Sequence, residues 1–176
     1  MSDQRTPDIR AGDVLPALEI PITRTLIVAG ALASRDYQDV HHDAELAQAK
    51  GSPDIFMNIL TTNGLVGRYL TDHFGPTAVL QKLAIRLGAP NYPGDTMTLT
   101  GTITEVDAST DTPTDAVTET HHTTAPATAE TTVQIRIIGT NGLGHHVTGT
   151  ATLHLPPGGA AASCASSPRR SPEGDV

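Results

Sequence analysis

The 176-residue chain fits one main domain, and its net charge of −8 argues against a nucleic-acid or anionic-membrane partner, since either selects a basic face. Its sole cysteine, Cys164, excludes an intrachain disulfide, and no apolar run approaches the roughly 20 residues of a membrane span. The first ten residues lack an apolar signal core, so we expect a cytoplasmic protein.

The first half of the chain predicts a strand followed by helices. Residues 1–20 are assigned to an N-terminal segment, and the run TRTLIVAGALAS at 23–34 to a first strand. The run DAELAQAKG predicts a helical turn that Asp43 caps and Gly51 closes. A long helix is expected from Asp54 to Phe74, where apolar residues recur three to four positions apart: Ile55, Ile59, Leu60, Val66 and Leu70.

Four strands are predicted after this helix, which Gly75-Pro76 ends. The first covers residues 78–90, and the next two alternate with one apolar face each: Met97, Leu99, Gly101 and Ile103, then Val133, Ile135 and Ile137. Residues 107–130 between them form a low-complexity loop insertion, Asn141-Gly142 turns the chain into the last strand, and residues 156–176 have the composition of a disordered tail. The fold class is α+β, with a central helix wrapped by an antiparallel sheet of about five strands.

Candidate functional residues gather in SRDYQDVHHDAELA, residues 34–47. Capping explains Asp43. Metal binding is disfavoured, because adjacent His41 and His42 point in different directions and no second ligand motif follows, so we expect no metal and no cofactor. Asp36 and His41 can converge on one water if the chain turns between them, and a carboxylate beside an imidazole suits acid–base chemistry. The roles of Asp39 and His42 stay open.

This stretch, with GSPDIFMNILT and IRLGAPNYPGDTMTLTGTITEV, resembles the MaoC-like (R)-specific enoyl-CoA hydratases of the hotdog superfamily. The resemblance spans about residues 24–155 and implies a single hotdog domain over 21–155. It places Asp36 and His41 on the residues that hold a water against a trans-2-enoyl thioester. The family's Asn-Pro is here Gln38-Asp39, and its His-Gly pair is Phe56-Met57. By family position, the backbone N–H of Met57 is the expected oxyanion donor.

Within this family the chain is most similar to the short subunits of actinobacterial hydratases that act on steroid side-chain CoA thioesters. The resemblance implies an acyl-CoA substrate and a second hotdog-containing subunit in a heteromer, with a homodimer as the alternative. Two rival functions remain. The chain could be a non-catalytic hotdog subunit that shapes a partner's pocket, or a hotdog thioesterase whose carboxylate lies on the central helix, for which Asp54 and Asp72 are available.

Overall fold

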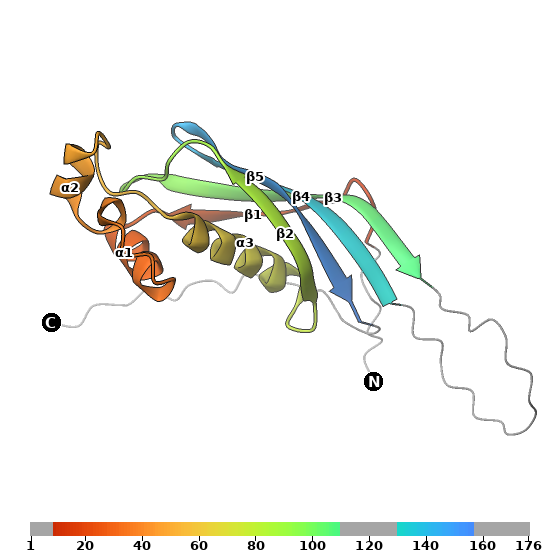
Figure 1. The fold of residues 1–176 in the computed structure, drawn as a ribbon. Coiled ribbons are helices and arrows are strands. Elements are labelled where there is room, and N and C mark those ends of the chain that lie inside the picture. The colour runs from red at the N-terminus through yellow and green to blue at the C-terminus, as the bar shows by residue number, and fades with distance from the viewer. Residues whose placement is uncertain (1–8, 110–129, 157–176) are drawn as a thin grey trace, which may run out of the picture.

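The computed structural model describes residues 9–109 and 130–156, which form one antiparallel sheet with helices on one side (Figure 1). The long helix α3 runs along one face of the sheet, and α1 and α2 gather at one end of it (Figure 1). The elements in chain order are β1 (Val14–Pro21), α1 (Arg24–Ala33), the short 3-10 helix η1 (Asp39–His41), α2 (Ala44–Ala49), α3 (Ile59–Phe74), β2 (Val79–Leu87), β3 (Thr96–Ser109), β4 (Glu130–Asn141) and β5 (Gly144–Leu155).

The five strands are ordered β1-β3-β4-β5-β2, and every pairing is antiparallel. β2 therefore pairs with the last strand and not with β3, which follows it in the chain. The connection from β2 to β3 crosses the end of the sheet, where Gly88 and Ala89 donate to the carbonyls of His146 and His145. Gly94, which follows Pro93 in this connection, turns the chain with a φ of +91°.

The core lies between α3 and the sheet, as the alternation of the strands predicts. The side chains predicted for the inner faces of β3 and β4 are buried: Met97, Leu99, Ile103, Val133, Ile135 and Ile137. Helix α3 contributes Val66, Tyr69, Leu70 and Phe74 from its facing side. The helix against an antiparallel sheet confirms the expected α+β class.

The first strand was predicted in the wrong place. Residues 24–33 form helix α1, which Thr23 caps by accepting from the Leu26 N–H, and which buries Ile27 and Ala31 one turn apart. The short apolar run has no clear period, so it suits a buried helix as well as a strand. The sheet instead gains its remaining strand from β1, which pairs with β3. Most of β1 lies before residue 21, where the domain was expected to begin.

Helix α3 starts at Ile59, five residues later than expected from the periodicity. The preceding segment is held extended because Phe56 donates to the Val40 carbonyl and Met57 to the Asn91 carbonyl. Asn58 then caps the helix through its side chain, which accepts from the Thr61 N–H.

The predicted loop and tail fall mostly outside the described residues. β3 continues to Ser109 and β4 begins at Glu130, so both strands extend into the expected 107–130 insertion, of which 110–129 are not described. Of the 156–176 tail, Pro156 alone is described. Among the described helices, none is long and apolar enough to cross a membrane.

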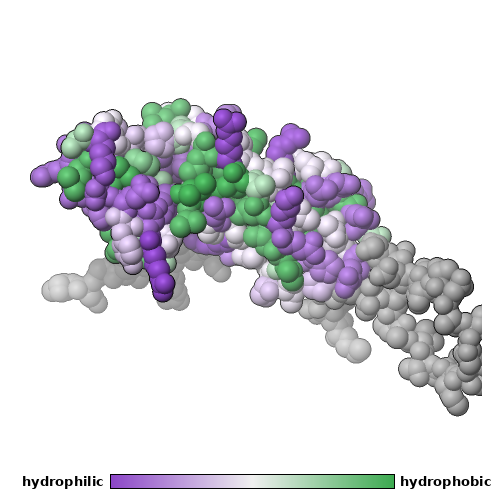
Figure 2. All heavy atoms as spheres, viewed as in Figure 1, coloured by the Kyte–Doolittle hydropathy of each residue, from purple (hydrophilic) through white to green (hydrophobic). Residues whose placement is uncertain are grey.

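Large apolar side chains are exposed near the end of the sheet where α1, η1 and the start of α3 meet. Ile59 and Leu60, in the first turn of α3, are 45% and 49% exposed. Leu32 in α1 and Tyr37, which follows α1, are also exposed. Val79 is exposed as well, at the end of the edge strand β2 that follows the C-terminal end of α3. Figure 2 shows apolar side chains (green) gathered on this face where α3 and β2 lie.

Candidate active site

Asp36 is placed by the way helix α1 ends. The Asp36 N–H donates to the Ala31 carbonyl at 2.9 Å, and the Arg35 N–H donates to the Leu32 carbonyl at 3.1 Å. This pair of bonds is the Schellman pattern, which requires a left-handed residue after the cap. Arg35 takes that conformation with a φ of 58°, although glycine is the usual choice there. The reversal directs the chain from α1 across to η1.

His41 is held by its own backbone and by the segment before α3. Its N–H donates to the Gln38 carbonyl at 3.0 Å, which forms the short helix η1. The ring nitrogen Nδ1 lies 2.7 Å from the Phe56 carbonyl oxygen, and the Phe56 ring packs edge-on against the imidazole at 5.1 Å between centroids. Since a carbonyl only accepts, Nδ1 carries a proton and donates to it.

The two predicted residues come together in space. His41 Nε2 lies 3.3 Å from Asp36 Oδ2, and the side chains are 7% and 19% exposed. Both ring nitrogens of His41 thus face oxygen acceptors, an arrangement that a doubly protonated ring satisfies in full. The Asp36 carboxylate also accepts from the Gln38 N–H at 3.4 Å and from the Asn58 side-chain amide at 3.0 Å. The geometry offers acid–base chemistry by a buried imidazole and a carboxylate that is partly exposed.

The remaining polar side chains of residues 34–47 have other roles. Asp43 caps α2 by accepting from the Leu46 N–H at 3.0 Å, as predicted. Asp39 pairs with Lys50 at 2.7 Å, and the hydrogen bond and charge of that ammonium hold the pKa of Asp39 below its ordinary value. His42 is exposed. Among the residues that the structure describes, no three His, Cys, Asp or Glu side chains are grouped to hold a metal ion.

The expected oxyanion donor is already paired within the chain. The Met57 N–H donates to the Asn91 carbonyl at 3.1 Å. Asn91 is fully buried, and its side chain accepts from Asn141 and lies 3.8 Å from the Met57 sulfur. Met57 is therefore anchored to the β2–β3 connection. The geometry does not support an oxyanion role for its N–H, because the proton that a thioester oxygen would need is already donated.

A buried histidine went unrecognised at the sequence level. His146, the third residue of β5, is 1% exposed and lies beneath α3. Its Nδ1 donates to the Ala89 carbonyl at 2.7 Å, and its Nε2 accepts from the Thr62 hydroxyl at 2.9 Å. Burial lowers the pKa of His146, against a smaller opposing effect of the Ala89 carbonyl. In the alternation of β5, Val147 faces inward, so its neighbour His146 is expected to face outward. The sequence pattern therefore did not predict that His146 is buried.

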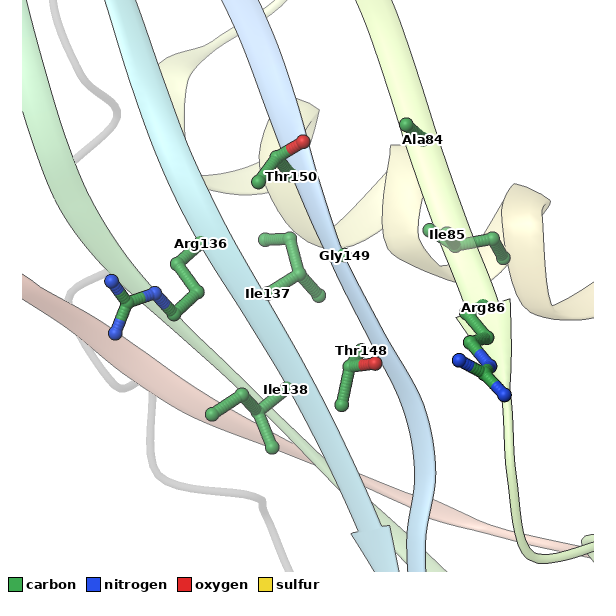
Figure 3. Close-up of a pocket in the computed structure, with 9 residues that line it drawn as sticks. All are labelled: Ala84, Ile85, Arg86, Arg136, Ile137, Ile138, Thr148, Gly149 and Thr150. Atoms are coloured by element: carbon green, nitrogen blue, oxygen red, sulfur yellow. The ribbon is translucent and has the colours of Figure 1, made fainter.

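A shallow pocket on the sheet lies away from these residues. It is lined from β2, β4 and β5, with the Arg86 and Arg136 side chains on either side of Thr148 and Thr150 (Figure 3). Helix α3 lies behind the strands in this view (Figure 3). Neither Asp36 nor His41 lines the pocket, so it is not the acid–base site.

Comparisons with known proteins agree with the fold described above and with the resemblance of residues 34–47. The MaoC-like domain family matches residues 9–125, and the chain belongs to that family. The R-hydratase PhaJ1 from Pseudomonas aeruginosa is 17% identical with a TM-score of 0.67, and each chain is covered to 93%. At that identity the likeness shows the hotdog fold alone.

Two closer relatives come from Mycobacterium tuberculosis. The 3-oxo-4,17-pregnadiene-20-carboxyl-CoA hydratase beta subunit is 42% identical over 144 residues, which are 82% of this chain and 95% of the relative. A chain in the crystal structure of the ChsH1-ChsH2 complex is also 42% identical, with a TM-score of 0.66, and covers 83% of this chain and 98% of its own length.

Proposed function

We propose that the chain is the catalytic subunit of an enoyl-CoA hydratase, which adds water to a trans-2-enoyl-CoA thioester, and that the acyl group is a steroid side chain. The observation that carries this proposal is the 3.3 Å distance between Asp36 Oδ2 and His41 Nε2. Hydrogen bonds to other parts of the chain hold both side chains in place. The substrate class comes from the relative that is 42% identical, whose name states a hydratase of a pregnadiene carboxyl-CoA.

The proposed reaction uses the pair as base and acid. Asp36 takes a proton from a bound water, whose oxygen bonds to the β-carbon as the carbon–carbon double bond opens toward the α-carbon. His41 gives its Nε2 proton to the α-carbon on the same face. The proton on Asp36 then returns to Nε2 across the short gap between the side chains. One water is added, and both groups regain their starting states.

The thioester oxygen gains negative charge during this addition and needs donors. The start of α3 is at the site, because Asn58 contacts Asp36 there. The N–H groups of Ile59 and Leu60 belong to the first helical turn and have no intrahelical acceptors, and the helix dipole adds to their effect. We assign the oxyanion role to these N–H groups rather than to that of Met57.

A second hotdog subunit is proposed as the partner, in a heteromer. β2 is an edge strand that pairs with β5 on one side, so its other side offers backbone groups to a further strand. Ile59 and Leu60 are exposed in the first turn of α3, next to Asn58 at the site, and Val79 is exposed on the edge strand β2. Exposed apolar side chains such as these favour burial by a partner. The ChsH1-ChsH2 complex, which contains a relative of this chain, is consistent with that arrangement.

The thioesterase alternative has less support from the carboxylates it would use. Asp54 precedes α3 and is held in a two-point ion pair with Arg24, with 3.0 Å between Arg24 Nη1 and Asp54 Oδ1. Asp72 pairs with Arg68 at 3.1 Å on the exposed side of the helix. Neither faces the buried pair.

A product assay separates the proposed functions. The chain is purified alone and with a co-expressed second hotdog subunit, and each preparation receives a steroid enoyl-CoA or a short straight-chain trans-2-enoyl-CoA. We expect loss of the enoyl absorbance and formation of the hydroxyacyl-CoA, fastest with the steroid thioester and the two-subunit preparation. Release of free CoA thiol instead would indicate a thioesterase, and no hydration by either preparation would contradict the proposal.

A further inference from the structure

We infer that Asn58 is a positioning residue for the Asp36 carboxylate, which deepens and rests on the hydratase function proposed above. Asn58 Nδ2 lies 3.0 Å from Asp36 Oδ2, the same oxygen that faces His41. The asparagine is 2% exposed and lies at the start of α3, so its contact with Asp36 joins the helix to the turn after α1.

The orientation of the Asn58 amide is fixed by its other partners. Its Oδ1 accepts from the Thr61 N–H at 2.9 Å, which only an oxygen can do. The NH₂ group must then face the other way, where it reaches Asp36 Oδ2 and, at 2.9 Å, Ser34 Oγ. The Ser34 hydroxyl in turn donates to the Gly30 carbonyl at 2.7 Å. Every hydrogen-bonding atom of the Asn58 side chain is engaged, so the side chain has one favourable orientation.

This contact explains what orients Asp36 when the motif carries Gln38-Asp39 in place of Asn-Pro. Gln38 offers Asp36 a backbone N–H at 3.4 Å, a long contact, and the Asp39 carboxylate is paired with Lys50. The Asn58 amide donates to Asp36 Oδ2 at 3.0 Å, on the same oxygen that His41 Nε2 faces at 3.3 Å. A hydrogen bond at 3.0 Å restricts the carboxylate more than a contact at 3.4 Å does. Asn58 therefore keeps one oxygen of Asp36 directed at His41.

The test is a double-mutant cycle in the two-subunit enzyme. Asn58→Ser keeps a helix-capping oxygen but removes the amide donor. We expect it to lower kcat on the order of 10- to 100-fold, the range for a catalytic group displaced by about 1 Å, with little change in KM. In an Asp36→Asn background the same substitution changes the residual rate less than about twofold, because the two residues act as a unit. Thr23→Ala, which removes the cap of α1, lowers stability and leaves kcat unchanged.

A stability measurement gives a second readout that does not depend on activity. Asn58→Asp keeps the shape and the cap but places two carboxylates side by side, so the melting temperature falls at neutral pH. Adding Asp36→Asn restores an amide–carboxylate pair, with the carboxylate now at position 58 and the amide at position 36. We expect the melting temperature of this double variant to recover.

The outcomes distinguish this inference from the function on which it rests. A wild-type kcat for Asn58→Ser, or an equal loss in both backgrounds, would overturn the positioning role, provided that Asp36→Asn still lowered the rate at least about 100-fold. No recovery of the melting temperature in the exchanged pair would overturn the direct contact. Wild-type activity of Asp36→Asn would instead overturn the hydratase proposal itself.

Discussion

The packing of α1 on α3 sets the distance between the turn that carries Asp36 and the cap that holds it. The two helices pack tightly at Gly30, where an added Cβ would lie 2.2 Å from Thr61 Oγ1 and 3.0 Å from Thr61 Cβ. Ordinary contact begins near 3.4 Å. Thr61 Oγ1 at 2.2 Å and Cγ2 at 2.8 Å are both too close to the added Cβ, so Gly30→Ala forces the two helices apart.

The expected magnitudes follow from that clash. Overpacking costs about 1–3 kcal/mol, and alanine regains about 1 kcal/mol over glycine within a helix, so we expect a net loss of roughly 0–2 kcal/mol in the free energy of unfolding. Activity is more sensitive, because a shift of about 1 Å between reacting groups can cost about 100-fold. Gly30→Ala should therefore lower kcat far more than it lowers stability.

The matched rescue is Thr61→Ala. It removes Oγ1, which has no hydrogen-bond partner in its buried position, and Cγ2, which would lie 2.8 Å from the new methyl. Hydration kinetics and urea unfolding are measured for the wild type, the two single variants and the double variant. We expect the double variant to recover most of kcat. A Gly30→Ala enzyme with wild-type kcat, or a double variant as impaired as Gly30→Ala, would refute the reasoning.

Two further predictions concern pH and backbone strain. Because burial lowers the pKa of His146 below its ordinary value of 6.5, the folded chain binds fewer protons there than the unfolded chain. Its contribution to stability is complete above about pH 6.5 and is lost as the pH falls toward the folded pKa. The urea midpoint of unfolding should therefore fall less steeply with decreasing pH for His146→Gln than for the wild type. Equal slopes for the two proteins would contradict this. Arg35→Gly should keep its activity in the hydration assay, whereas Arg35→Val, a branched residue forced to a positive φ, should be about 1–2 kcal/mol less stable than the glycine variant by urea unfolding; equal stability of the two variants would show that the turn has relaxed.

The strands after the central helix were predictable because each has a clear period of two and one packed face. Ile103 and Val133 are buried as their alternation requires. Helix α1 was mistaken for a strand because its apolar run has no polar face to reveal a helical period. The start of α3 was placed too early because Ile55 continues the helical spacing while its neighbours are held extended by hydrogen bonds to distant segments.

The candidate site likewise has residues that the sequence predicts and residues that it does not. Asp36 and His41 could be predicted because they lie five residues apart in a recognisable motif, and the structure brings their side chains together. Asn58 could not, since its contact with Asp36 depends on how α3 packs beside α1. The Met57 N–H was assigned by family position, and its acceptor comes from a connection 34 residues further along the chain.

The measurement that tests the central claim most directly is the hydration rate of Asp36→Asn in the two-subunit enzyme, with Asp39→Asn as the matched control. Both variants remove one carboxylate from the same short stretch, but Asp36 faces His41 whereas Asp39 pairs with Lys50. General acid–base catalysis contributes about 10²- to 10⁴-fold, so we predict a loss of at least about 100-fold for Asp36→Asn and near wild-type rates for Asp39→Asn. Undiminished hydration by Asp36→Asn would contradict the account.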